Sequence, residues 1–397
     1  MDALKIKDDI YWAGSLDYDL KVFDIIMHTD FGTTYNAYVI KGHNKNVLVE
    51  ISKDKFFNEF FERLKSIIDP ADIDYIVLNH TEPDHSGSLK QLLPHCPKAV
   101  IAAAGPALRF LKEIVNEEFK SIQVSEDYRI DIGGKTLRFI MAPFLHWPDT
   151  MFTYVPESRT LFTCDAFGCH YCDKKVFNDL IEGDFYDAYK YYFDNILGPF
   201  KKNVLDALEK IKSLQIETIC NGHGPVIRKD PQKYIDMYRA WAAPVVKDVK
   251  AIVIAYVSAY GYTKQMAQSI ADGLKSVSGV EVSMYDFVYD DINEAMNKID
   301  EADGILLGSP TLAGDALPVI YNVLTHLNPY YHKGKIIGLF GSYGWSGEAV
   351  PNMEARVKQL KLAMPLPGLR VPFCPSERQL KDCAEFGEKF GRALKNE

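Results

Sequence analysis

The sequence of 397 residues has no long apolar run and no apolar leader. Its longer apolar runs, such as AIVIAYV at 251–257, fall far short of the roughly 20 residues that cross a bilayer. Residues 1–14 lack the apolar centre that a signal peptide has. We therefore expect a soluble, cytoplasmic protein that does not interact with membranes.

The sequence also lacks a basic cluster and an even set of cysteines. Its 45 Lys and Arg against 54 Asp and Glu give a net charge of −9, which argues against nucleic acid as a partner. Seven cysteines without a secretory signal argue against a disulfide framework. The pair Cys169 and Cys172 has C-x-x-C spacing, but no second pair completes a four-thiolate site. We interpret these two as reduced thiols beside a loop, with a redox or metal role as the alternative.

The first part of the chain mixes strands and helices without a regular order. Short apolar runs bounded by turn residues predict strands, and the spacing of apolar residues in 56–68 predicts a helix. The expected strands are 36–40, 46–51, 75–80, 137–148, 151–155, 160–168 and 216–224, the first two forming a hairpin. This pattern predicts an α/β sandwich.

From residue 250 onward, strands and helices alternate. Alternation of this kind is typical of a doubly wound parallel sheet. The expected strands are 251–258, 280–287, 304–310 and 335–344, and the expected helices include 263–277 and 292–302. A helix at 231–246 leads out of the first part, so we place the domains at 1–248 and 249–397.

Residues that bind metals follow several of the expected strands. The segment NHTEPDHSGS at 79–88 comes directly after one strand, in the kind of position where a scaffold presents functional groups. We expect its spacing to form an extended turn that directs four side chains into one pocket. The candidate ligands are His80, Glu82, Asp84 and His85 from this segment, and His146, Asp165 and His223 from the ends of later strands.

Seven ligands are too many for one tetrahedral metal ion and suit two ions with a shared carboxylate. Imidazole and carboxylate ligands without cysteine favour iron or manganese. A balanced division gives one ion His80, Glu82 and His146, gives the other Asp84, His85 and His223, and makes Asp165 the bridge. A single isolated histidine is more often a hydrogen-bonded core residue, so the prediction depends on the whole set.

Three loops follow strands of the second domain at their C-terminal ends. SAYGYT at 258–263 has the hydroxyls and backbone N–H groups that hold a phosphate, while 308–316 and 341–347 can flank a flat ring. Neither a Walker loop nor a dinucleotide fingerprint is present. The candidate cofactor contacts are Ser258, Ala259, Tyr260, Gly261, Tyr262, Thr263, Ser309, Pro310, Thr311, Leu312, Gly314, Asp315, Ala316, Ser342, Tyr343, Gly344, Trp345 and Gly347.

These motifs resemble two known families. The ligand motif at 80–85 resembles that of the metallo-β-lactamase superfamily, whose hydrolases carry H-x-H-x-D-H on an αβ/βα sandwich. In this sequence Glu82 stands in place of the middle histidine. An anionic oxygen stabilises the higher charge of an oxidised metal, and H-x-E-x-D-H is typical of flavodiiron proteins within that superfamily. The three loops resemble flavodoxin. The two resemblances together cover nearly the whole chain.

The resemblance to flavodiiron proteins implies FMN and two non-haem iron ions per chain. It implies an oxidoreductase that reduces dioxygen to water, nitric oxide to nitrous oxide, or both. Electrons come from a donor such as rubredoxin, a reduced deazaflavin or a flavin reductase. The resemblance also implies a head-to-tail homodimer, possibly a dimer of dimers. Tyr192, His28 and His170 are the candidate catalytic residues near the iron pocket.

Two other functions fit parts of the sequence. One is a metallohydrolase with a regulatory flavodoxin domain, against which Glu82 argues. The other is an electron carrier or redox sensor with an inactive metal site, against which the complete set of seven ligands argues. The sequence does not distinguish dioxygen from nitric oxide as the substrate.

Overall fold

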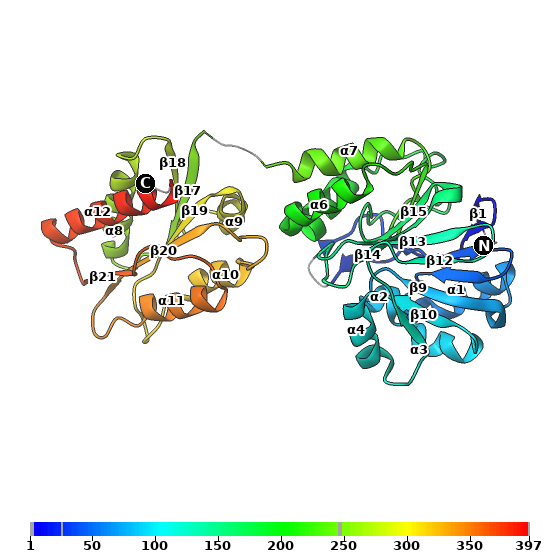
Figure 1. The fold of residues 1–397 in the computed structure, drawn as a ribbon. Helices are drawn as coiled ribbons and strands as arrows, with labels where there is room; N and C mark the ends of the chain where they lie inside the picture. The colour runs from blue at the N-terminus through cyan, green and yellow to red at the C-terminus, as the bar shows by residue number, and fades with distance from the viewer. Residues whose placement is uncertain (1–3, 25–26, 245–247, 396–397) are drawn as a thin grey trace. The chain divides into compact units, whose positions relative to one another are not determined.

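The computed structural model describes residues 4–24, 27–244 and 248–395. The chain forms two compact units, Met1–Ala243 and Pro244–Glu397 (Figure 1). This division lies five residues before the boundary expected after residue 248, and residues 245–247, at the end of the expected linker helix, lie outside the described part. In the described residues, no helix has both the length and the apolar character needed to cross a membrane.

The first unit contains a seven-stranded sheet in the order β1-β2-β7-β8-β9-β10-β11. Its strands are β1 (Leu4–Lys7), β2 (Ile10–Trp12), β7 (Tyr38–Lys41), β8 (Asn46–Val49), β9 (Ile73–Leu78), β10 (Val100–Ala103) and β11 (Ser121–Gln123). Strands β7 and β8 pair antiparallel with Lys41 opposite Asn46, which confirms the expected hairpin. The last strands, β8 to β11, run parallel.

A second sheet of the same unit has the order β12-β13-β14-β15-β16. Its strands are β12 (Arg129–Asp131), β13 (Thr136–Met141), β14 (Met151–Val155), β15 (Thr160–Cys164) and β16 (Thr218–Asn221). Three of these end several residues before the expected positions. After β13, Pro143 and Pro148 have no N–H group for a ladder, and after β15 the chain turns where Gly168 N–H donates to Asp165 O. The candidate ligands therefore lie on loops beyond the strands.

The two sheets pack face to face with helices outside them (Figure 1). Alternate residues of β13 belong to different cores: Phe139 packs with the first sheet, and Ile140 packs with the helices on the other side. The covering helices are α1 (Phe57–Ile67) and α4 (Gly105–Val115) on the first sheet, and α5 (Tyr186–Tyr192), α6 (Lys201–Ile211) and α7 (Pro231–Ala242) on the second. This arrangement confirms the expected αβ/βα sandwich.

The second unit is a five-stranded parallel sheet in the order β18-β17-β19-β20-β21. Its strands are β17 (Lys250–Tyr256), β18 (Val280–Asp286), β19 (Gly304–Gly308), β20 (Ile336–Tyr343) and β21 (Leu369–Pro372). One face is covered by α8 (Tyr262–Lys275) and α12 (Glu377–Leu394), the other by α9 (Ile292–Glu301), α10 (Pro318–His326) and α11 (Ala349–Gln359). The strand order is that of flavodoxin-like folds, with the switch point between β17 and β19.

Candidate functional site

The segment at 79–88 presents its candidate ligands from two different structures. His80 and Glu82 lie in the loop after β9, whereas Asp84 and His85 belong to the short helix α2 (Pro83–Ser86). The extended turn expected for the whole motif is therefore wrong for its second half. Pro83 has the fixed φ that suits the first position of a helix, so the chain begins a helical turn there.

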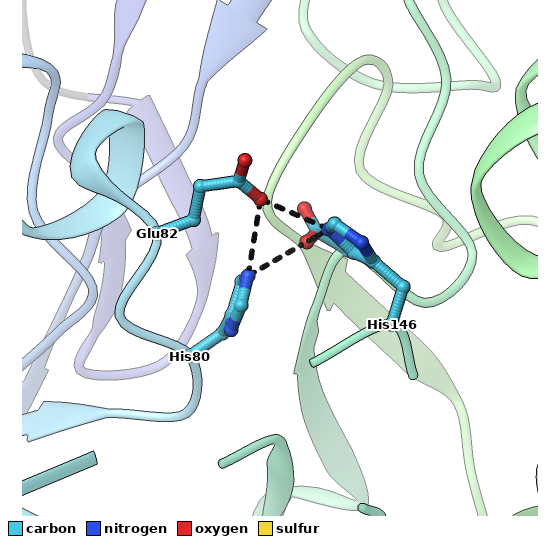
Figure 2. A group of neighbouring side chains, drawn as sticks. His80, Glu82 and His146 are labelled. Carbon is cyan, nitrogen blue, oxygen red and sulfur yellow. Dashed lines mark hydrogen bonds and ion pairs between the residues drawn. The ribbon is translucent and has the colours of Figure 1, made fainter. Parts of the chain in front are cut away.

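The first group of side chains contains His80, Glu82 and His146, which Figure 2 shows converging. One oxygen of Asp165 completes this group. Glu82 Oε2 lies 3.3 Å from His80 Nε2 and 2.9 Å from His146 Nε2. Asp165 Oδ2 lies 3.4 Å and 3.2 Å from the same two nitrogens. The Glu82 and His146 side chains are 14% and 15% exposed, so this group has an opening toward solvent.

The second group consists of Asp84, His85 and His223, and it is more deeply buried. Asp84 Oδ2 lies 3.5 Å from His85 Nε2 and 3.1 Å from His223 Nε2. Asp165 Oδ1 lies 3.0 Å and 3.4 Å from these nitrogens. Asp165 thus directs one carboxylate oxygen at each group. The structure brings the seven residues together in the division that the sequence indicates.

The chemistry of this pocket fits two bound cations. Both oxygens of Asp84 and Oδ2 of Asp165 are buried, and within the described part of the chain they accept no hydrogen bond. Buried carboxylate oxygens without hydrogen bonds are costly unless a charge compensates them. All four histidines direct Nε2 at Asp165 Oδ2 or Asp84 Oδ2, which is the arrangement of imidazole ligands around a metal ion.

Two histidines of the set are oriented by residues that the sequence did not single out. His80 Nδ1 donates to Asp149 Oδ1 at 3.1 Å, and the other oxygen of Asp149 accepts from Thr81 N–H and Oγ1. His223 Nδ1 donates to Thr34 O at 2.7 Å. Each bond leaves the Nε2 lone pair directed at the pocket, which is the second contact that metal-bound histidines usually make. The residues come from distant segments, so no local pattern identifies them.

Charge pairing inside the pocket is strong enough to outweigh burial. Burial opposes a charged His85, but the Asp84 and Asp165 carboxylates raise its pKa to about 9. Burial likewise opposes a charged His146, but Asp165 and Glu82 raise its pKa to about 9. Burial also opposes an ionised Asp165, yet the His85 charge and the surrounding imidazoles hold its pKa well below the usual range. The carboxylates are therefore ionised and ready to bind cations.

The three candidate catalytic residues differ in their distance from the pocket. Tyr192 donates from its hydroxyl to Asp165 Oδ1 at 3.2 Å, and burial raises its pKa well above the ordinary value. His170 is buried with its ring 5.4 Å from that of His223, and its Nδ1 lies 3.0 Å from Thr33 Oγ1. His28 is exposed on β5 (Met27–His28), and in the described residues no hydrogen bond or ion pair joins it to the seven.

Two further carboxylates lie near the pocket and are not among the ligands predicted from the sequence. Glu50 is 1% exposed, accepts from Asn79 N–H at 3.0 Å and has φ +58°, a conformation that side chains rarely adopt. Burial raises its pKa to about 7. Burial and the charges of Glu82 and Asp84 raise the pKa of Asp24 to about 6. Neither residue is part of a recognisable spacing.

The thiols of Cys169 and Cys172 are free in the structure. Burial raises the pKa of both thiols, that of Cys172 to about 12, so the thiolate forms are disfavoured. In the described residues neither cysteine belongs to a group that could hold a metal ion. These observations favour the interpretation as reduced thiols over a redox or metal role.

The second unit has a cavity of about 470 Å³ at the C-terminal ends of β17, β19 and β20. Eleven of the eighteen candidate contacts line it: Ala259, Tyr260, Tyr262, Pro310, Thr311, Leu312, Gly314, Ser342, Tyr343, Gly344 and Trp345. Four further residues line the cavity outside the candidate set: Ala313, Ser346, Glu348 and Phe373. Phe373 follows β21, beyond the three loops considered, so only the strand order brings it to the cavity.

The other seven candidate contacts, Ser258, Gly261, Thr263, Ser309, Asp315, Ala316 and Gly347, do not line this cavity. Some of them hold the loops in place. Thr263 Oγ1 is 2.9 Å from Ser342 Oγ, and Ser309 Oγ accepts from Leu317 N–H at 3.0 Å. Asp315 Oδ1 accepts from Tyr321 and Asn352. These side chains are engaged with the protein itself.

The beginning of α8 fits a phosphate group beside the cavity. Gly261 precedes the helix with φ +82°, which glycine adopts without strain. In the first turn Lys264 N–H donates to Ser258 Oγ, and within the described residues no side-chain hydrogen bond caps the first two N–H groups of the helix. Uncapped N–H groups at a helix N-terminus bind anions. Tyr262 and Ala259 line the cavity on either side of this glycine, so a ring in the cavity and a phosphate at the helix can belong to one ligand.

Comparisons with known proteins agree with this geometry. Residues 33–224 match the ODP family beta lactamase, and residues 254–387 match the flavodoxin family. The flavo-diiron protein FprA2 of Clostridium acetobutylicum is 40% identical to this chain, and the match covers 99% of this chain and 100% of FprA2. The chain belongs to the flavodiiron protein family.

Other relatives of this flavodiiron protein match over nearly its full length. A protein named nitric oxide reductase, from Moorella thermoacetica, is 38% identical over 98% of both chains. The structure of the rubredoxin oxygen:oxidoreductase from Desulfovibrio gigas superimposes with a TM-score of 0.72 at 27% identity, covering 100% of this chain and 99% of the other. The chain is an oxidoreductase, and its family implies FMN and a diiron centre.

Proposed function

We propose that this flavodiiron protein transfers electrons from FMN to a pair of non-haem iron ions, where dioxygen, nitric oxide or both are reduced. The observation that carries the proposal is Asp165, whose two carboxylate oxygens face two groups of ligands. Bound iron supplies exchange between the +2 and +3 states, and bound FMN supplies one- and two-electron transfer. The names of the relatives from Moorella and Desulfovibrio support both substrates.

The residues of the pocket have different roles, which follow from their positions and their burial. We assign His80, Glu82 and His146 to one ion, Asp84, His85 and His223 to the other, and Asp165 to both. The partly exposed side of Glu82 and His146 gives a small gas its entry. Tyr192 remains protonated beside Asp165, so its hydroxyl can donate a hydrogen bond or a proton to the reacting oxygen.

The reactions require different numbers of electrons. One dioxygen takes four electrons and four protons to give two waters. Two nitric oxides take two electrons and two protons to give nitrous oxide and one water. An external donor such as rubredoxin, a reduced deazaflavin or a flavin reductase replenishes FMN in either reaction.

The composition of the purified protein tests the proposal first. We expect two iron ions and one FMN per chain, measured by metal analysis and the flavin absorption spectrum. One zinc ion per chain without flavin would instead support a metallohydrolase. Reduced protein mixed anaerobically with a known amount of each gas then measures whether dioxygen or nitric oxide is consumed faster, with the donor varied.

We also propose that electrons cross between the two chains of a head-to-tail dimer. Three aromatic side chains that line the flavin cavity are largely exposed in the single chain: Trp345 at 97%, Tyr260 at 79% and Phe373 at 58%. Aromatic surface around a cofactor site is typical of a surface that a partner covers. If a closed two-fold dimer is arranged head to tail, each flavin unit lies against the partner's metal unit.

A mixed dimer tests this transfer. One chain carries His85→Ala and His223→Ala, so it binds FMN but little iron. The other carries Ala259→Glu, whose carboxylate repels the phosphate at the start of α8 beside the cavity, while Ala259→Ser serves as the matched control. Each homodimer should be inactive, and the mixed dimer should regain activity through one inter-chain pair of cofactors. A mixed dimer with its expected cofactors but without activity would show that transfer occurs within one chain.

A further inference from the structure

A second group of potential ligands lies in the flavodoxin-like unit and has no part in the proposed reduction. It consists of Asp300 in the last turn of α9, His326 at the end of α10, and His332 in the segment before β20. Asp300 Oδ1 lies 2.8 Å from His326 Nε2 and 2.9 Å from His332 Nε2. Three residues from two helix ends and a connecting segment thus direct their polar atoms at one point.

This group is separated from the flavin cavity by the length of the sheet. Asp300 lies just before β19, and Ile336 at the start of β20 donates its N–H to Asp303 O. The group therefore lies at the N-terminal ends of these strands, whereas the loops of the cavity follow their C-terminal ends. The five residues of β19 span roughly 16 Å at about 3.3 Å per residue. The group is not part of the flavin site.

One of the three residues is buried, and the other two are partly open to solvent. His332 is 2% exposed, while the side chains of Asp300 and His326 are 27% and 37% exposed. Asn328 N–H donates to His332 Nδ1 at 2.9 Å, and Asn328 O lies 3.2 Å from the same nitrogen. A cation at Nε2 takes the tautomer in which Nδ1 carries the proton and donates to this carbonyl oxygen, in place of accepting from Asn328 N–H.

The surrounding charges also favour a cation. Helices α9 and α10 both end at the group, and helix C-termini carry a partial negative charge that adds to that of Asp300. Lys335 brings an opposing positive charge, but its ammonium donates to the backbone oxygens of Asp300 and Ala302, which partly compensate it. Asp303 lies close in sequence and adds negative charge, shared with Lys250 at 3.0 Å.

We propose that Asp300, His326 and His332 form a binding site for a divalent cation of the zinc type, separate from the diiron centre. Two imidazoles, one carboxylate and a water from the open side complete a tetrahedral zinc sphere. Zinc–ligand bonds of about 2.0 Å separate neighbouring ligands by roughly 3.3 Å, so the two N···O distances must widen slightly. The exposed His326 can make that movement. The ion connects the end of α9 to the segment that leads into β20.

Metal binding to the holoenzyme is the first test. Protein with its iron and FMN quantified is dialysed against buffered Zn²⁺, and all metals are then measured by mass spectrometry. We expect one additional zinc per chain while iron and FMN stay constant. If zinc is gained at the expense of iron, it has entered the diiron centre, which would contradict the proposal. No gain at about 0.1 mM free Zn²⁺ would also contradict it, because the dissociation constant would then be roughly millimolar or weaker.

Matched histidine variants locate the ion. His326→Gln keeps a side chain that can donate to Asp300 but loses the imidazole, and it should bind the added zinc at least 10-fold more weakly. His95→Gln changes an exposed histidine of the other unit and should bind zinc like the wild type. Equal zinc binding by both variants would overturn the assignment.

Amide hydrogen exchange gives a readout that is independent of metal counting and activity. Because the ion holds His326 and His332 together, zinc should slow exchange in residues 327–335 of the wild type. His326→Gln should show no such slowing, although its exchange without zinc should resemble that of the wild type. Slowing confined to the metal unit would contradict the proposed site.

Discussion

The two cofactor regions of this chain differ in how much of each is buried within the protein. In the metal unit, His80, His85 and Asp165 are almost fully buried, and each is held by other residues of the pocket. In the flavin unit, Trp345 and Tyr260 line the cavity and are mostly exposed. The chain itself buries the side chains of the metal pocket, whereas the exposed aromatic side chains of the flavin cavity become covered only when something binds there.

This difference follows from the chemistry of the two cofactors. A metal ion requires several charged groups within a few ångströms, and such groups are stable in the interior only when they compensate one another. A flavin is large, with a flat apolar ring and a phosphate, so it contributes its own surface to the core of the complex. Substitutions in the metal pocket should therefore have larger effects than substitutions in the cavity.

The largest effect is expected for Asp165→Ala, which tests whether the metal pocket depends on one central carboxylate. This variant should bind both metal ions more than about 100-fold more weakly, since even outer partners contribute about 10–100-fold. Glu82→Ala should lose mainly the ion of the first group. Metal titration of the two apoproteins compares them, and equal losses would argue against Asp165 as a bridge.

We expect a similarly large effect for Glu82→His, which recreates the hydrolase motif and should change which metal the pocket binds. The neutral imidazole removes the anionic oxygen that favours oxidised iron, so the variant should take up zinc in preference and lose its reductase activity. Circular dichroism should show an intact fold. A variant that keeps iron and normal turnover would show that Glu82 does not select the metal.

An intermediate effect is expected for Asp149→Asn, which tests the orientation of His80 by a residue outside the ligand set. Asparagine accepts only through one oxygen, so it cannot satisfy His80 and Thr81 as the carboxylate does. Metal affinity should fall about 10–100-fold, as for other outer partners. Asp187→Asn on an exposed face of α5 is the control and should leave affinity unchanged.

The smallest effect is expected for Trp345→Ala in the flavin unit. Stacking of an aromatic side chain on a base contributes about 1–3 kcal/mol, so FMN affinity should fall about 10-fold. The free energy of unfolding of the apoprotein should change by less than about 0.5 kcal/mol, because the side chain is 97% exposed. Fluorescence titration with FMN measures the first quantity, and Tyr289→Ala, an exposed aromatic outside the cavity, is the control.

The sequence by itself determined which residues gather in the metal pocket, because they follow predicted strands in recognisable spacings. It likewise indicated the two folds. Strands and helices follow one another irregularly before residue 250 and alternate regularly after it, and the two patterns are typical of different folds. The shape of individual loops was less predictable. The expected strand at 137–148 ends at Met141, and Pro83 starts a helical turn in place of an extended one.

Only the tertiary structure decided which residues support the pocket and which line the cavity. Asp149 reaches His80 across 69 positions of the chain, and Thr34 reaches His223 across 189. Contacts over such distances depend on sheet order and packing, which leave no local spacing in the sequence. The same reason applies to Asp300, His326 and His332: their separation along the chain has no motif, and only two helix ends meeting at one edge of a sheet bring them together.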